Sequence, residues 1–270
     1  MRNNPLLHEY ALDPQVTAFS TTRHGGCSQG TYASLNINPY CGDGESHVSQ
    51  NRQALCERLA VRNDRLFLPH QTHHTEVVDI TEDLFQVTSP DALPLLLEGK
   101  DAITTNITNC CIGVSAADCI PVLLYDPQHH VAAAVHAGWR GTVARIVEKT
   151  ILHMQQRYGS VPQRMKAVIG PGISLESFEV GDEVYAAFAD ARFPMEKLAG
   201  RFPAMRKDEV GEKWHIDLPA CNRLQLLSAG LPATQILSSG ICTYRHSDDF
   251  FSARRLGIQS GRIFTGIVLR

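Results

Sequence analysis

The sequence predicts one compact domain over residues 1–270, with mixed β-sheets flanked by helices. Three observations lead to this fold class. Short apolar segments between Gly- and Pro-rich turns are typical of strands. Longer segments carry apolar residues at helical spacing. The two kinds of segment alternate without a regular βαβ period, which favours a mixed sheet over a doubly wound parallel one. No linker-like stretch divides the chain, so we expect a single domain.

The strand candidates are short and mostly apolar. They cover residues 77–80, 112–114, 120–125, 131–136 and 167–169. Residues 120–124 are apolar at every position, a pattern typical of a strand that is buried on both faces. We therefore expect this segment at the centre of a sheet.

Four helices are expected, over residues 46–59, 142–158, 182–191 and 218–229. The first begins with a capping residue, Ser46. The second is the best defined, because Val143, Ile146, Val147, Ile151 and Met154 fall on one stripe and Gly159 supplies a stop. Residues 199–212 carry charges and few apolar side chains, and form the segment that we expect to be least ordered.

Composition excludes several classes of function. The 270 residues are 43% hydrophobic, enough for a core without disulfides, and eight cysteines are too few for a disulfide scaffold. A net charge of −3 provides no basic surface for nucleic acid or membrane lipid. No apolar run approaches the ~20 residues of a membrane-spanning helix, and no signal core follows the N-terminus. We expect a cytoplasmic protein without nucleic-acid or membrane partners.

Three histidines lie within the segment His70-Gln71-Thr72-His73-His74, just before a predicted strand. In an extended segment alternate residues share a face, so His70, Thr72 and His74 would point one way and His73 the other. Local geometry then does not let all three bind one ion. The alternative interpretation is a solvated polar turn.

A second segment, Ser115-Ala116-Ala117-Asp118-Cys119, enters the apolar strand at residues 120–124. Strand ends are where a rigid scaffold presents side chains to a cleft. Asp118 needs a partner there, since an unpaired buried carboxylate is costly. For Cys119 the alternative is an inert buried thiol.

A third segment, His136-Ala137-Gly138-Trp139-Arg140-Gly141, predicts a strand, a turn and the start of a helix. Backbone amides at such a turn can receive an anion, and Arg140 adds positive charge. It lacks the spacing of a nucleotide-hydrolase phosphate loop. The alternatives are a core histidine at His136 and ordinary packing for Trp139.

Taken together, His73, Cys119 and His136 could come from three strand ends to hold a metal ion. Three protein ligands with an open fourth position are typical of catalytic zinc sites. The ligands are far apart in the sequence, so spacing does not support them directly. A metal-free pair of a Cys nucleophile and a His base remains an alternative.

Arginines in or near Gly-rich turns and close to the C-terminus form a fourth feature, because a guanidinium suits bidentate capture of phosphate or carboxylate. Solvated surface charge is the alternative for each of them. These residues are Arg23, Arg254, Arg255 and Arg262.

The three segments resemble the YfiH-type proteins, also called the laccase-domain or polyphenol oxidase family and now regarded as purine nucleoside phosphorylases. The resemblance covers nearly the whole chain. Further matching motifs, in order, are Thr22-Arg23-His24-Gly25-Gly26, Ser34-Leu35-Asn36, Gly42-Asp43, Asn51-Arg52, Lys100-Asp101-Ala102, Ile169-Gly170-Pro171, Phe178-Glu179-Val180-Gly181, Asp217-Leu218, Cys242-Thr243, Phe251-Ser252-Ala253-Arg254-Arg255 and Gly261-Arg262.

The resemblance implies a single α+β domain and a zinc ion held by His73, Cys119 and His136. It also implies phosphorolysis of adenosine, inosine and methylthioadenosine to free base and ribose 1-phosphate, with deamination of adenosine. Two departures from the family pattern concern the site. Thr72 and His74 stand where the family usually has Val and Gly, and His74 adds an alternative ligand. In the arginine motif, Ala253 replaces the usual Tyr and Leu256 the usual Asp, and the lost Tyr could change base stacking or specificity.

For catalysis we assign roles to Cys119, His136 and Asp118, the last as a proton shuttle or as an orienting residue. The expected partners are a nucleoside and phosphate, and the sequence does not define the oligomeric state. Candidate phosphate ligands are Arg23, Arg140, Arg254 and Arg262.

Three other functions stay open. Two His and one Cys can also bind copper, as the family's older name suggests, but one mononuclear site does not store the four electrons that reduce dioxygen to water. A metal-free Cys–His hydrolase could edit cell-wall precursors, a process to which some family members are linked. A binding module could hold a nucleoside without turnover.

Overall fold

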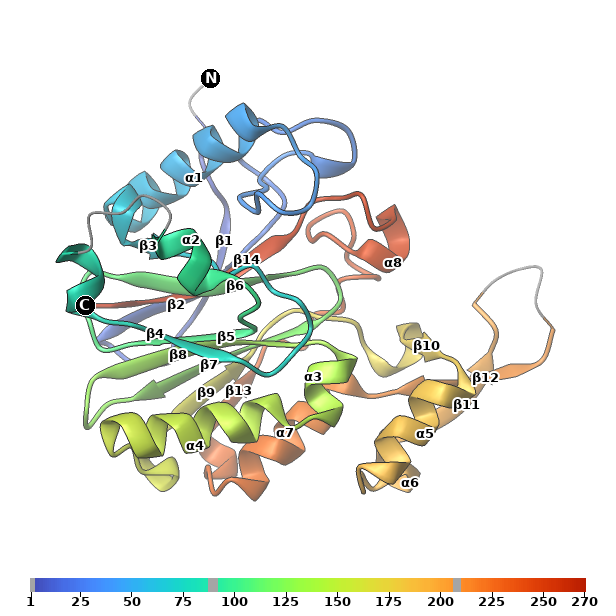
Figure 1. Ribbon diagram of the computed structural model, residues 1–270. Helices are drawn as coiled ribbons and strands as arrows, with labels where there is room; N and C mark the ends of the chain where they lie inside the picture. The colour runs from blue at the N-terminus through green and yellow to red at the C-terminus, as the bar shows by residue number, and fades with distance from the viewer. Residues whose placement is uncertain (1–2, 87–91, 206–209) are drawn as a thin grey trace.

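Two β-sheets pack face to face between helical layers (Figure 1). The structure, a computed structural model, describes residues 3–86, 92–205 and 210–270. The five-stranded sheet has the order β1-β2-β14-β6-β3, and the six-stranded sheet the order β13-β9-β7-β8-β5-β4. Both are mixed, because β3–β6, β4–β5 and β9–β13 are parallel and the other neighbours are antiparallel. The predicted single domain with mixed sheets is confirmed.

The strands of the five-stranded sheet are β1 (Leu7–Tyr10), β2 (Val16–Thr21), β14 (Ile263–Leu269), β6 (Cys111–Ala116) and β3 (Leu66–Phe67). Those of the six-stranded sheet are β13 (Ile236–Ser238), β9 (Lys166–Ile169), β7 (Ile120–Asp126), β8 (Val131–Ala137), β5 (Ala102–Thr105) and β4 (Val77–Ile80). All five predicted strands are present, with ends that differ by at most two residues.

Strand β7 shows why an all-apolar segment becomes a central strand. Val122 and Leu124 face the helical side of the six-stranded sheet, whereas Leu123 and Tyr125 face the other sheet. Successive side chains of a strand point to opposite faces, so both faces must be apolar. Burial on both sides makes β7 the rigid element at whose start Cys119 lies.

Helices cover the outer faces of the two sheets (Figure 1). Helix α1 (Glu45–Leu59) packs on the five-stranded sheet, and α4 (Ile146–Tyr158) and α7 (Leu218–Ser228) pack on the six-stranded sheet. The remaining helices are short: α2 (Ala92–Leu97), α3 (Trp139–Val143), α5 (Asp182–Asp190), α6 (Met195–Leu198) and α8 (Ala253–Leu256). Single 3₁₀ turns cover Gly30–Tyr32, Asn63–Arg65, Glu82–Gln86, Pro162–Arg164, Leu175–Ser177 and Ala233–Gln235.

The helix predicted over residues 142–158 is interrupted, which corrects the sequence-based expectation. Arg145 adopts a left-handed conformation (φ 62°) between α3 and α4. Its guanidinium donates to the Ala191 carbonyl at 2.8 Å and lies 3.7 Å from the Phe193 ring centroid. These long-range contacts accompany a backbone conformation that the apolar stripe alone does not reveal.

The cap assigned to Ser46 is also wrong. Helix α1 begins at Glu45, Gly44 is the N-cap, and no side chain caps it. Ser46 lies within the first turn, where its hydroxyl accepts a hydrogen bond from the Gln50 amide at 3.0 Å.

A small third sheet projects from the body of the molecule (Figure 1). It has the order β10-β12-β11, formed by Glu179–Val180, Glu212–Ile216 and Ala199–Pro203. The expectation of low order over residues 199–212 is therefore wrong for β11, which pairs antiparallel with β12 and places Arg201 over the Trp214 ring. Residues 206–209 of that segment lie outside the described ones. In the part of the chain that the structure covers, no helix is long and apolar enough to cross a membrane.

Candidate metal centre

His73, Cys119 and His136 meet at one end of the two sheets. Their ligand atoms all lie within 4.8 Å of one another, and Cys119 Sγ is 4.0 Å from His73 Nε2. Residue 119 precedes β7, and His136 lies near the end of β8, directly opposite Pro121 in the antiparallel pair. This pairing brings Cys119 beside His136, so the topology accounts for two of the three positions.

The segment that carries His73 is a turn, which corrects the expected alternation of an extended strand. His73 has φ 64°, and the backbone N–H groups of Thr72, His73 and His74 all donate to the carboxylate of Asp101, at 3.1, 3.0 and 2.8 Å. Successive N–H groups in a tight turn form a concave site for an anion. Wrapping this turn around a carboxylate brings the His73 imidazole to Cys119 and His136, while exposed His74 lies outside the trio.

Asp101 is the functional residue that residue-by-residue reasoning missed. It is fully buried, and its Oδ1 accepts from His136 Nδ1 at 2.8 Å. Burial would raise its pKa, but the hydrogen bond and charge of His136 and the backbone N–H groups outweigh burial and lower it. With Nδ1 engaged, Nε2 of His136 is the nitrogen left for a metal. A signal was present, because an acidic residue directly before the strand at Ala102 requires compensation.

The charges of Cys119 and His136 are strongly coupled. Burial would raise the pKa of the Cys119 thiol, but the charge of His136 and hydrogen bonds from both histidines lower it to about 6. Burial would lower the pKa of His136, but the Cys119 thiolate and the Asp101 carboxylate raise it to about 9. A thiolate at neutral pH is the form that binds metals.

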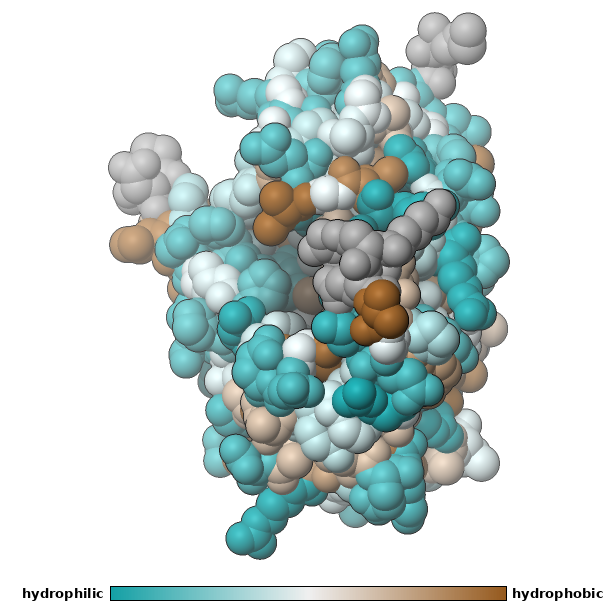
Figure 2. Space-filling model, turned by 90° about the vertical axis from the view of Figure 1, so that its right-hand side faces the viewer, coloured by the Kyte–Doolittle hydropathy of each residue, from teal (hydrophilic) through white to brown (hydrophobic). Residues whose placement is uncertain are grey.

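A cavity of about 470 Å³ lies against the trio. Figure 2 looks onto this end of the molecule, where the surface is hollowed. Residues of four other segments complete the wall: Asn38, Tyr40 and Cys41; His70 and Gln71; Ser115, Ala116 and Ala117; and Ala253, Ile258, Gln259 and Arg262. A second cavity, of about 520 Å³, shares His73 and is lined also by Thr72, His74, Thr75, Glu76, Arg140 and Ala144.

Gln71 joins the His73 turn to the strand that leads to Cys119. Its amide nitrogen donates to the Ser115 carbonyl, and its amide oxygen accepts from the Ser115 N–H, both at 2.8 Å. These two hydrogen bonds tie the turn that carries His73 to Ser115 of β6. They therefore fix the position of the turn relative to the strand end that leads to Cys119.

The Asp118 side chain is held by hydrogen bonds to neighbouring residues and does not point into a cavity. Its carboxylate accepts from Thr243 Oγ1 and from the backbone N–H of Arg254, both at 2.7 Å, and it does not line either cavity beside the trio. Its φ of 92° places the next residue, Cys119, at the sharp turn between the sheets. This geometry favours the orienting role over the proton shuttle.

The four candidate phosphate arginines do not converge on one point. Arg262 lines the cavity at the trio, although its guanidinium donates to the carbonyls of Ser260 and Ile258 at 2.6 and 2.8 Å. Arg140 lines the second cavity and stacks over Trp139, 4.3 Å from the ring centroid.

The guanidinium groups of the other two arginines donate to backbone carbonyls instead. Arg23 donates to the carbonyls of Ala33 and Ser247 at 2.8 and 2.7 Å, and Arg254 donates to the Glu179 carbonyl at 3.0 Å. Neither lines the cavities beside the trio. Their phosphate-binding role stays a prediction, to which their geometry adds no support.

The double-sheet fold and the His–Cys–His trio define a class of laccase-like domains. A sequence model of the family described as multi-copper polyphenol oxidoreductase laccase matches residues 17–270, and the chain belongs to this family. It is 46% identical to a purine nucleoside phosphorylase of Bacteroides thetaiotaomicron, covering 94% of this chain and 92% of the relative. It is 42% identical to adenosine deaminase RL5 of an unidentified prokaryote, covering 93% of each.

Solved structures show the same fold. The Bacillus licheniformis protein YfiH matches with a TM-score of 0.84 and 31% identity, covering 95% of this chain and 93% of that one. YlmD of Geobacillus stearothermophilus matches with a TM-score of 0.84 and 30% identity, covering 97% and 94%. The family resemblance read from the sequence motifs is confirmed.

Proposed function

We propose that this chain is a zinc-dependent purine nucleoside enzyme. It would cleave adenosine, inosine and methylthioadenosine with phosphate, to free base and ribose 1-phosphate, and deaminate adenosine. The observation that carries the proposal is the trio His73–Cys119–His136, supported by Asp101 and set in the wall of a cavity of nucleoside size. The names of the two relatives, a phosphorylase and a deaminase, supply the reaction class.

The donor set fits zinc. One thiolate and two imidazole nitrogens are common zinc ligands, and three protein ligands leave a position open for substrate. The lowered pKa of Cys119 and the hydrogen bond that orients His136 support such a site. Zinc held there would supply Lewis-acid chemistry next to the cavity.

Each reaction places a distinct demand on the protein. In phosphorolysis a phosphate oxygen bonds to C1′ of the ribose while the C1′–N9 bond breaks, and its electron pair leaves with the purine, which takes up a proton. In deamination a water oxygen bonds to C6 of adenine, and the C6–N bond breaks to release ammonia. Both need the purine fixed in the cavity, and the first also needs phosphate beside the ribose.

Arg262 is the arginine best placed for phosphate, since it lines the cavity at the trio. Arg140 lies at the cavity that shares His73 with the first, and its guanidinium stacks on Trp139. A guanidinium pre-organised by carbonyls or by stacking loses little entropy on binding an anion. We assign the phosphate to Arg262 and keep Arg140 as the alternative.

One chromatographic assay tests the proposal. The purified protein, supplied with zinc, is incubated with adenosine with and without phosphate, and adenine, inosine and hypoxanthine are separated. We expect adenine that depends on phosphate, and inosine in either condition. A folded Cys119→Ala variant should lose both products, whereas Leu152→Ala, on the exposed side of α4, should keep them. Absence of all three products, or full turnover by Cys119→Ala, would rule the proposal out.

The family description suggests a copper polyphenol oxidase as a second candidate. Among residues 3–86, 92–205 and 210–270, the trio is the one group of three or more His, Cys, Asp or Glu placed to hold an ion. A multicopper oxidase needs several coupled ions to collect four electrons, so this arrangement disfavours the oxidase. Oxygen uptake with a phenol by the copper-loaded protein would reverse this preference.

The low pKa of Cys119 beside two histidines keeps a metal-free hydrolase as a third candidate. In that mechanism a free thiolate attacks an amide carbonyl carbon, the C–N bond breaks as the leaving amine takes up a proton, and water then hydrolyses the thioester. Stoichiometric zinc that protects Cys119 from alkylation would exclude it, since a thiolate bound to zinc is not free to attack.

A further inference from the structure

Tyr40 and His70 form a stacked aromatic pair in the wall of the cavity that contains the trio. Their ring centroids are 4.1 Å apart and the ring planes are inclined by 21°. The Tyr40 residue nevertheless stays 45% exposed, and both residues line the cavity. A large flat side chain left open beside a reaction site offers a π-face to a ligand.

Hydrogen bonds to its ring and its backbone fix His70 in place. Its Nδ1 lies 2.9 and 2.8 Å from the two carboxylate oxygens of Glu98, its backbone N–H donates to the Leu97 carbonyl, and its own carbonyl accepts from the Gly99 N–H. A carboxylate at Nδ1 makes that nitrogen the donor and holds the ring in one orientation. The ring under Tyr40 is thus already in place before a ligand binds.

Hydrogen bonds within its own loop fix the backbone at Tyr40. Its backbone N–H donates to Asn38 Oδ1 at 2.6 Å, and the Asn38 amide donates to Ser115 Oγ at 2.5 Å. The Ser115 residue belongs to β6, the strand that leads to Cys119. A short chain of hydrogen bonds therefore connects the aromatic pair to the strand that positions a metal ligand.

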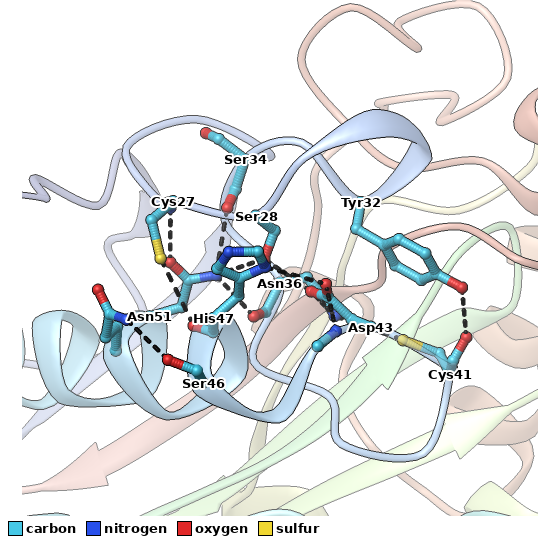
Figure 3. Close-up of polar contacts among 12 residues, drawn as sticks. Cys27, Ser28, Tyr32, Ser34, Asn36, Cys41, Asp43, Ser46, His47 and Asn51 are labelled. Atoms are coloured by element: carbon cyan, nitrogen blue, oxygen red, sulfur yellow. Dashed lines mark hydrogen bonds and ion pairs between the residues drawn. The ribbon is translucent and has the colours of Figure 1, made fainter.

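The loop around Tyr40 is anchored by a polar network (Figure 3). Asn36 donates to the Asp43 carboxylate at 2.9 Å, and Asn51 of α1 donates to the Asn36 carbonyl at 2.9 Å. Directly after Tyr40 in the chain, the Cys41 carbonyl accepts a hydrogen bond from the Tyr32 hydroxyl at 2.9 Å. Contacts on both sides make the pair a pre-organised surface rather than a mobile rim.

We infer that the Tyr40–His70 pair is the surface on which the purine base lies, and that Tyr40 determines affinity for the base. This inference rests on the proposed function and adds the residue that recognises the base. A purine offers a large flat π-face, whereas ribose and phosphate do not, so the stack recognises the base part of the substrate. Ala253, with its small side chain, lines the same cavity.

Replacing Tyr40 should separate binding from chemistry. Stacking of a base on an aromatic side chain changes affinity by roughly 5- to 150-fold. We expect Tyr40→Leu to raise the KM for adenosine within that range, with kcat and the KM for phosphate nearly unchanged. Tyr40→Phe, which keeps the ring, should stay within about twofold of the parent protein.

A binding measurement separates this inference from the proposed function. Free adenine is titrated calorimetrically into the purified, zinc-containing protein, so that no turnover is needed. Tyr40→Leu should bind adenine more weakly, in proportion to its change in KM. The matched control is Tyr185→Leu, which removes a tyrosine stacked on Trp214 outside both cavities and should bind as the parent does.

The outcomes are distinct. Normal turnover with unchanged KM and unchanged adenine affinity in Tyr40→Leu would overturn the inference and leave the proposed function standing. Weaker adenine binding in Tyr40→Leu, without nucleoside turnover by any variant, would support the base-binding surface and overturn the proposed function. Equal losses in Tyr40→Leu and Tyr40→Phe would also overturn the inference, because the ring would then not be the cause.

Discussion

At the scale of single residues, the Asp101 carboxylate organises the proposed metal centre. It accepts hydrogen bonds from three consecutive backbone N–H groups at residues 72–74 and from His136. The same carboxylate therefore sets the turn that carries His73 and the ring orientation of His136. Two of the three proposed ligands, His73 and His136, are therefore positioned by Asp101.

We expect Asp101→Asn to weaken zinc binding about 10- to 100-fold, the usual effect of losing a residue that orients a ligand. An amide oxygen lacks the charge and the second acceptor needed to satisfy all four donors. Zinc affinity is measured by competition with a chromogenic chelator. Asp79→Asn, the same change at a carboxylate remote from the trio, is the control and should bind zinc normally. Equal affinities for the Asp101 variant and the parent would contradict this role.

Cys119 should react as a thiolate when the metal is removed. Since its pKa is lowered from 9.0 to about 6, the thiolate fraction in the chelated protein stays high at pH 7 and falls only as the pH drops through about 6. Alkylation by iodoacetamide, followed by mass spectrometry of the Cys119 peptide, measures this profile. His136→Gln should move the midpoint upward, because the positive charge of His136 is the largest cause that lowers the pKa. A midpoint near 9 in the parent protein would refute the coupling.

At the scale of elements, Asp79 joins the edge strand β4 to its neighbours. Its carboxylate accepts from Thr104 Oγ1 on β5, and from His153 Nε2 at 2.8 Å and Tyr158 Oη at 3.0 Å on α4. The Asp79 side chain is 21% exposed. Burial would raise its pKa, but these hydrogen bonds and the charge of His153 outweigh burial and lower it.

Asp79→Asn should therefore lower the free energy of unfolding by about 1–3 kcal/mol at pH 7, the usual cost of weakening a hydrogen-bonded charge. Because the pKa in the folded state is below the unfolded value of about 3.9, the carboxylate stabilises the fold above that value. The contribution is lost as the pH falls through the folded pKa. Urea unfolding at pH 7 and pH 3 should show a difference between parent and variant that shrinks in acid. Asp64→Asn, at an exposed pair with Arg62, should change little at either pH.

Elements whose own residues determine them could be predicted, and elements that depend on distant contacts could not. Strand β7 was predicted because every position is apolar, whatever packs on it. The break at Arg145 was not, because the apolar stripe continues across it and the contacts at Ala191 and Phe193 come from another part of the chain.

The residues of the candidate site also separate into those that the sequence predicts and those that it does not. His73, Cys119 and His136 stood out by residue type and by position at strand ends. The sequence predicts an extended segment at residues 72–74, but the structure has a turn there, because its conformation depends on Asp101, which is distant in the sequence. The arginines were grouped by chemistry alone, and their positions depend on loops whose paths local sequence does not encode.

At the scale of the whole molecule, the trio lies where the chain passes between the two sheets. Residues 117–119 run from β6 of the five-stranded sheet into β7 of the six-stranded sheet, and the His73 turn runs from β3 of the first sheet to β4 of the second. His136 lies on β8, inside the six-stranded sheet. A bound ion would therefore connect both crossings to a central strand.

Metal removal should in consequence destabilise the whole domain rather than one loop. With free zinc 1,000-fold above its Kd, binding adds about 4 kcal/mol to the free energy of unfolding, which corresponds to a Tm higher by roughly 8–16 °C for a domain of this size. We expect a chelator to lower the Tm by that order in a single cooperative transition, and zinc to restore it. Cys119→Ser should show a lower Tm that responds much less to either addition. A chelator effect of the same size in Cys119→Ser would place the stabilising ion elsewhere. A separate early transition would contradict this prediction. It would mean that the two sheets unfold independently, so that an ion held where the chain crosses between them does not couple their unfolding.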